Sequence, residues 1–187
     1  MAKKMYLVDD RNKALTVFEI LVQIVVVAVL ALFIAKYFFY SAETESKSME
    51  PTIEPSSVVF VNRTSYLFNG PKRFDVVAFD RGESGRNDDV LVRRIVGLPG
   101  ETVRITRGTV YINDVKLNID GIISEITSDG IAASAIRLDD DEYFVLGDTP
   151  ANSEDSRSST IGAVNVSQIV GRAWLSAKSL TEITFIR

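Results

Sequence analysis

The sequence contains no cysteine and no histidine among its 187 residues. Without cysteine the chain has no disulfide, no thiolate nucleophile and no cysteine-ligated metal. Without histidine it lacks the commonest metal ligand and the usual general base. No metal-ligand spacing remains, so we expect no metal. The missing cysteine does not assign a compartment, because a protein outside the cell need not carry disulfides.

An excess of charge of one sign is also lacking. The formal net charge is −4, and acidic and basic residues are interspersed along the chain. Nucleic-acid-binding domains gather basic residues on one surface, so no nucleic-acid partner is indicated. The length suits one globular domain with an appendage.

One long apolar run is present at residues 20–40, interrupted only by Gln23 and Lys36. A helix of this length, rising about 1.5 Å per residue, would cross a hydrocarbon core of roughly 30 Å. The positive-inside rule predicts residues 1–19 in the cytoplasm, a transmembrane helix at 20–40 and an extracytoplasmic domain at 41–187. The basic residues that set this orientation are Lys3, Lys4, Arg11 and Lys13.

A cleaved secretory signal and a buried core helix are the alternatives to a membrane anchor. The apolar region of a signal spans about 7–15 residues and ends at a small-x-small site. Here the run is longer, and Tyr40-Ser41-Ala42 matches such a site poorly. A helix packed on a globular core is amphipathic, whereas this run is apolar all round. We therefore predict a single-pass cell-membrane anchor.

Short strand patterns separated by turn signals follow the anchor. The region 116–141 has weak patterning and is expected to be a variable hairpin or loop, and no repeated helix pattern is present. A hairpin is expected around Arg107-Gly108. The fold class is therefore a mostly β, all-β domain of short antiparallel strands behind one N-terminal transmembrane helix. The expected strands are 58–61, 75–79, 90–96, 102–105, 110–112, 143–146 and, last in the chain, 172–175.

Four stretches of this domain resemble, in order, the boxes of the type I signal peptidases. They are Ser46–Thr52, Arg73–Val77, Arg93–Glu101 and Gly147–Arg157. Members of that family are membrane-anchored serine proteases that remove signal peptides from exported proteins. The resemblance implies a signal-peptidase-like fold, signal peptides of exported preproteins as partners, and no cofactor.

The resemblance also implies a role for individual residues. Ser48 matches the nucleophile, and its backbone N–H with the Ser46 hydroxyl matches the oxyanion hole. Ser153 matches the serine that orients the general base. Asp155 and Arg157 match a supporting ion pair, although without the family they would be read as a solvated pair. The positions that match the shallow apolar substrate pockets are Met49, Ile53, Leu91 and Val92, of which the last two could equally be core side chains.

The general base of this family is a neutral, buried lysine, and its position is taken here by Arg93. A guanidinium stays protonated with a pKa above about 12, so Arg93 should donate a hydrogen bond to Ser48 and not accept its proton. Lys47 would point away from its neighbour on an extended segment. Lys72 and Lys116 lie in or near turns. The pair Thr149-Pro150 replaces the usual Asn-Arg, which is consistent with relaxed demands on the site.

Two functions follow from these residues. The first is a signal peptidase, a hydrolase that cuts exported proteins after small residues during secretion. The alternative is a catalytically impaired accessory protein that binds exported clients, for example in pilus assembly. Arg93 with Thr149-Pro150 favours the second function. The first is favoured by the retained residues of the site, which are Ser46, Ser48, Ser153, Asp155 and Arg157.

Overall fold

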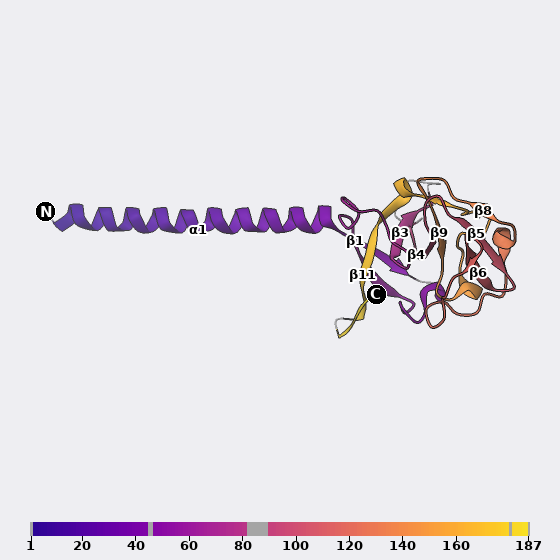
Figure 1. Cartoon of the computed structure of the whole chain (residues 1–187). Coiled ribbons are helices and arrows are strands. Elements are labelled where there is room, and N and C mark those ends of the chain that lie inside the picture. The colour runs from indigo at the N-terminus through magenta and orange to yellow at the C-terminus, as the bar shows by residue number, and fades with distance from the viewer. Residues whose placement is uncertain (1, 45–46, 82–89, 180, 187) are drawn as a thin grey trace. The chain divides into compact units, whose positions relative to one another are not determined.

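The computed structural model describes the backbone of residues 2–44, 47–81, 90–179 and 181–186. Side chains are described for residues 15–33 and for the same ranges from residue 47 onward. The chain divides into two compact units, Met1–Phe39 and Tyr40–Arg187. The first is a helix and the second is a β unit (Figure 1).

The helix α1 runs from Ala2 to Phe38, so it begins well before the predicted residue 20 and ends before residue 40. Residues 2–19 contain neither glycine nor proline, so no residue in them stops the helix. The aromatic residues at its end favour a strand, and β1 begins at Phe39. Within α1, Leu15–Phe33 has a mean hydropathy of 2.7 and exposed side chains, and is long enough to cross a membrane.

The β unit is built mainly on one antiparallel sheet. In the described residues its strands follow the order β1-β2-β11-β3-β4-β9-β10, and β12 pairs with β11 as an eighth strand. The central strands β3 and β4 are buried along most of their length, which explains their nearly continuous apolar sequence. The bounds are β1 Phe39–Thr44, β2 Ser57–Asn62, β3 Val76–Asp80, β4 Val90–Gly97, β9 Glu142–Leu146, β10 Val164–Asn165, β11 Ile169–Ser179 and β12 Glu182–Phe185.

A smaller sheet has the order β7-β6-β5-β8. Its strands are β5 Thr102–Thr106, β6 Thr109–Ile112, β7 Val115–Lys116 and β8 Ile136–Arg137. The predicted hairpin around Arg107-Gly108 is confirmed, because Thr106 pairs with Thr109 and both turn residues have positive φ. In Figure 1 this sheet lies beyond β4 and β9, at the side of the unit away from β11. The all-β fold class is therefore confirmed.

Some predicted boundaries are wrong. The predicted last strand 172–175 is part of the longer β11, and β12 follows it. The region 116–141 is largely irregular, as expected, but contains the 3₁₀ turn η3 at Gly130–Ala133 and the short strand β8. The remaining 3₁₀ turns are η1 Lys47–Met49, η4 Pro150–Asn152 and η5 Val166–Gln168.

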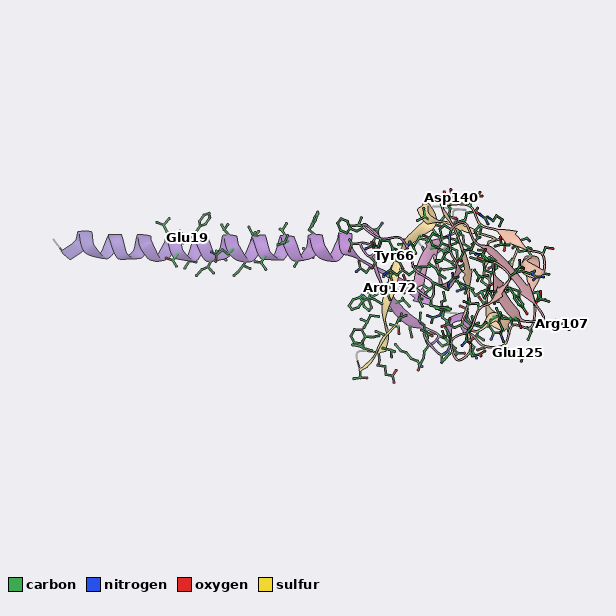
Figure 2. All side chains as sticks on the ribbon, in the orientation of Figure 1. Glu19, Tyr66, Arg107, Glu125, Asp140 and Arg172 are labelled. Carbon is green, nitrogen blue, oxygen red and sulfur yellow. The ribbon has the colours of Figure 1, made fainter. Side chains whose placement is uncertain are left out.

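One buried carboxylate holds the start of β3. Asp75 accepts hydrogen bonds from the Tyr66 hydroxyl at 3.0 Å and the Lys72 backbone N–H at 3.0 Å. The Arg172 guanidinium lies 3.3 Å from the same carboxylate. Tyr66 and Arg172 accordingly lie near each other in Figure 2. These contacts tie the start of β3 to β11, and β3 pairs on its other side with β4, which carries Arg93.

Candidate active site

Ser48 lies in the 3₁₀ turn η1, and only 1% of it is exposed. The Ile53 backbone N–H donates to the Met49 carbonyl at 2.8 Å, and the Thr149 backbone N–H donates to the Ser48 carbonyl at 2.9 Å. The expectation of an extended segment here is wrong, because the turn closes its own backbone hydrogen bonds. Lys47 is nevertheless exposed while Ser48 is buried. The serine is therefore held from both the η1 and the β9 sides.

Arg93 projects from β4 directly onto this serine. Its Nη1 donates to the Ser48 Oγ at 2.9 Å and to the Val92 carbonyl at 2.6 Å, and its Nε donates to the Glu154 carbonyl at 2.8 Å. The hydrogen bond expected from Arg93 to Ser48 is thus present. Only 4% of Arg93 is exposed, and this burial lowers its pKa to about 10, against the opposing pull of Asp155 and Glu154.

Arg93 remains a cation at this pKa. At pH 7 a group with a pKa of about 10 is neutral in only about one molecule in 10³. The four lysines of the described β unit, Lys47, Lys72, Lys116 and Lys178, are all exposed, so none has the burial that would neutralise it. Among the described side chains, no group of three His, Cys, Asp or Glu residues could hold a metal ion.

Ser153 is placed beside Ser48 but does not bond to Arg93. Its Oγ is buried and has no hydrogen-bond partner among the described residues, because Arg93 reaches the neighbouring carbonyl of Glu154 instead. Gly147 permits this close approach, since a Cβ there would lie 2.3 Å from the Ser153 Oγ and 2.7 Å from the Ser48 carbonyl. Ser46, the other predicted hydroxyl of the site, lies outside the described residues.

Asp155 and Arg157 form a buried pair and not a solvated one. The Arg157 Nε lies 2.8 Å from Asp155 Oδ1 and Nη2 lies 2.9 Å from Oδ2, a two-pronged contact. The same carboxylate accepts the Gly147 backbone N–H at 3.1 Å, and Arg157 Nη1 donates to the Ser128 carbonyl at 3.0 Å. The pair thereby fixes the loop that carries Ser153.

A second buried pair was not predicted from the sequence. Arg94 donates to Asp148 through Nε at 2.8 Å and Nη2 at 2.7 Å, and both side chains are nearly inaccessible. Thr52 completes the network by accepting from Arg94 at 3.1 Å and donating to Asp148. Two adjacent arginines within an apolar strand pattern could have indicated such a pair, because each buried guanidinium needs a buried acceptor.

Thr149 and Pro150 both form hydrogen bonds that hold the site. The Thr149 hydroxyl donates to the Glu50 carbonyl at 2.8 Å, beyond the Ser48 turn. Pro150 opens η4, where its missing N–H costs nothing, and its carbonyl accepts from Arg157. The interpretation of relaxed demands is therefore unnecessary, since both residues help to hold the nucleophile turn and its supporting loop.

The structure brings together three of the four predicted substrate-pocket residues. Met49, Ile53 and Val92 are buried in one apolar cluster that also contains Val59 and Val76. Leu91 is half-buried and packs on a different cluster, on the other face of β4. The first three therefore form an apolar layer next to Ser48, and Leu91 does not share it.

Comparison with known proteins identifies the family of the chain. The model of the family "Signal peptidase, peptidase S26" matches residues 17–177. Signal peptidase I of Bacillus amyloliquefaciens is 33% identical over 155 residues, covering 79% of this chain and 80% of the relative. Signal peptidase I of Leptolyngbya laminosa is 35% identical over 150 residues, covering 78% and 71%. A crystal structure of a signal peptidase I from Enterococcus faecalis V583 is 31% identical, covering 56% of this chain and 97% of its own, with a TM-score of 0.43. Because the family model spans most of its length, the chain belongs to the signal peptidase family, peptidase S26.

Proposed function

We propose that the chain is a membrane-anchored serine endopeptidase that removes signal peptides from exported proteins. The observation that carries this proposal is the burial of Ser48 where η1, β4 and the 147–157 segment meet, with the Arg93 guanidinium 2.9 Å from its hydroxyl. Ser48 is the nucleophile, and its N–H with the Ser46 hydroxyl would stabilise the oxyanion. The small side chains before the cut would lie at the surface over Met49, Ile53 and Val92, which are themselves buried, with Leu91 beside Val92 in sequence.

Cleavage by this site is expected to be slow. A serine hydroxyl becomes a good nucleophile when a neighbouring base removes its proton, and that base contributes roughly 10²–10⁴-fold. Arg93 contacts the hydroxyl, and at pH 7 it is a donor. Asp155 and Arg157 hold the loop that carries Ser153, so we place the loss of rate at the proton transfer.

A second candidate is an accessory protein that binds exported clients without cutting them. The observation in its favour is that the protonated Arg93 guanidinium donates a hydrogen bond to the Ser48 hydroxyl. The lysines of the described β unit are exposed, and they are Lys47, Lys72, Lys116 and Lys178. Such a protein would retain the peptide site and lack the base.

The location proposed for either function is the cell membrane. Residues 20–40 would cross it once, with residues 1–19 inside and the β unit, residues 41–187, outside. The exposed apolar segment Leu15–Phe33 of α1 supports this arrangement. Client signal peptides would then reach Ser48 at the outer surface of the membrane.

The experiment is cleavage of a signal-peptide substrate by the purified full chain in detergent. We compare the native chain with Ser48→Ala, Arg93→Lys and the double variant. Arg93→Lys is expected to raise the rate by roughly 10²–10⁴-fold, because a buried lysine can be neutral. Arg104→Lys, an exposed change of the same kind on β5, is the control and should leave the rate unchanged.

Cleavage by the native chain that Ser48→Ala abolishes supports the peptidase. Cleavage that begins only with Arg93→Lys supports the accessory protein. A native rate that survives Ser48→Ala would contradict Ser48 as the nucleophile.

A further inference from the structure

Three polar side chains lie on one face of α1, inside its apolar segment. The polar residues of Leu15–Phe33 are Thr16, Glu19 and Gln23. Steps of three and four positions separate them, and residues at these spacings line one side of an α-helix. All three side chains are exposed, and Glu19 is labelled in Figure 2. The segment proposed to cross the membrane therefore carries a polar stripe on one side and apolar side chains elsewhere.

Gln23 lies within the hydrocarbon layer from whichever end of the segment its depth is measured. At a rise of about 1.5 Å per residue, it is about 12 Å from Leu15 and about 4.5 Å from residue 20, where the predicted span begins. An amide in hydrocarbon is costly unless its N–H and C=O groups find hydrogen-bond partners. The helix backbone satisfies its own polar groups, so it offers the amide no ready partner. The structure has no hydrogen bond between the described side chains of Glu19 and Gln23, so the amide needs a partner from outside the helix.

The polar stripe continues along the helix as apolar side chains at the same spacing. Val26, Leu30 and Phe33 follow Gln23 at steps of three, four and three positions, and each is more than half exposed. Alternating steps of three and four repeat every seven residues, which is the spacing of the seam between two supercoiled helices. Transmembrane helices mostly pack in this left-handed arrangement. One face of α1 therefore offers polar and apolar contacts in the register that a second helix needs.

We propose that α1 pairs in the membrane with α1 of a second copy of the chain, along the face that holds Glu19, Gln23, Val26 and Leu30. Two copies inserted in the same orientation present Gln23 at the same depth. A glutamine amide has both donors and an acceptor, so two of these amides bond reciprocally across a two-fold axis. This self-complementarity is the reason that the partner is a second copy. The inference uses the proposed membrane location of α1 and does not depend on the proposed activity.

Because the chain has no cysteine, disulfide cross-linking can map the paired face. Val26→Cys and Leu30→Cys lie on that face, whereas Ala28→Cys lies between them in depth and on the opposite side of the helix. Oxidation of membrane vesicles with copper phenanthroline should join two full chains of 20.7 kDa at positions 26 and 30, and few at position 28. Equal cross-linking at the three positions, or none at any of them, would overturn the proposal. An adduct of any other mass would identify a different partner and would overturn it as well.

Two substitutions separate pairing between copies from a hydrogen bond within one helix. Gln23→Leu should weaken association by roughly three- to thirty-fold, the effect of one hydrogen bond between membrane helices. Glu19→Gln should strengthen association, because it replaces two like charges at one depth by a second pair of amides. Val25→Leu, off the paired face, is the control and should change nothing.

Association is measured in lipid vesicles by energy transfer between full chains labelled at Asp140→Cys. If the Gln23 amide instead bonds to Glu19 of its own helix, Gln23→Leu will leave association unchanged, and the proposal is then wrong. Cleavage is not measured, so a chain that never cuts signal peptides can pass this test, and an active peptidase can fail it.

Discussion

Arginine and lysine respond to burial in the same direction but reach different protonation states. Burial lowers the pKa of Arg93 to about 10, below the usual value of an arginine. The same lowering would bring a lysine from about 10.4 to roughly 8. At pH 8 about half of such lysines would be neutral, compared with about 1% of Arg93. This difference of roughly fifty-fold in available base is the physical reason to expect a slow enzyme.

The pH profile of the native chain follows from this pKa. If neutral Arg93 is the base, the active fraction grows as pH rises towards about 10, so the Ser48-dependent cleavage rate should increase about tenfold per pH unit between pH 7 and 9. The Arg93→Lys variant should instead level off near pH 8. Initial rates are measured from pH 6 to 9.5, with Ser48→Ala subtracted as the blank. A native rate that does not change with pH would show that Arg93 is not the base.

Thr149 provides a second test at the residue scale. Thr149→Val keeps the shape and the backbone N–H that bonds the Ser48 carbonyl but removes the hydroxyl that bonds the Glu50 carbonyl. The loss of one hydrogen bond to a partly buried carbonyl should lower the free energy of unfolding by about 1 kcal/mol. Chemical denaturation measures this change.

Thr127→Val is the matched control, because Thr127 is exposed and its hydroxyl has no described partner. Equal stabilities for the two variants would mean that the Thr149 hydroxyl does not hold the Ser48 turn.

At the scale of elements, Arg94 and Asp148 join the central strand β4 to the segment after β9. Both are buried, and Thr52 links them to the end of the η1 loop. Asp148→Asn keeps the volume but removes the counter-charge of a buried guanidinium. Breaking a buried pair in this way costs about 3–5 kcal/mol, so a large loss in the free energy of unfolding is expected from urea titration.

The exposed pair Arg104–Asp114 gives the comparison for this change. Asp114→Asn removes a carboxylate from a pair whose side chains are 42% and 86% exposed. Solvent screens such a pair, so no measurable loss of stability is expected. If Asp114→Asn lowered the free energy of unfolding as much as Asp148→Asn, burial would not be the reason for the cost of breaking the Arg94–Asp148 pair.

Local elements such as hairpins could be predicted from the sequence, whereas the pairing of strands that lie far apart in the chain could not. The β5–β6 hairpin was predictable because the adjacent residues Arg107 and Gly108 lie between two strand patterns. Both adopt the positive φ that such a turn requires. β11 lies between β2 and β3, and no local pattern specifies partners that distant. β12 was missed since its side chains are exposed and supply no buried face to read.

The candidate site shows the same division. The hydrogen bond from Arg93 to Ser48 was predictable from the motif order and from the chemistry of guanidinium. Its bond to the Glu154 carbonyl was not, because it depends on the path of the 147–157 loop. That the buried Ser153 Oγ is left without a hydrogen-bond partner among the described residues could likewise be seen only in three dimensions.

At the scale of the whole molecule, the absence of cysteine makes the membrane topology directly measurable. A single engineered cysteine is the only thiol in the chain. Asp140→Cys places it on an exposed turn of the β unit (Figure 2), and Asp10→Cys places it in the predicted cytoplasmic segment. With the N-terminus inside, a membrane-impermeant maleimide should label intact cells at position 140 and should label position 10 only after permeabilisation.

The same two variants separate an anchor from a cleaved signal. An anchored chain keeps both positions in one membrane-bound polypeptide of 20.7 kDa. A cleaved chain would release the labelled position 140 into the medium without residues 1–40, because its apolar segment would have been removed. Labelling of position 10 in intact cells would show the opposite orientation. Ser48 would then lie on the cytoplasmic side, where exported proteins have not yet crossed the membrane. The proposed action on signal peptides at the outer surface therefore depends on position 140 being the labelled one.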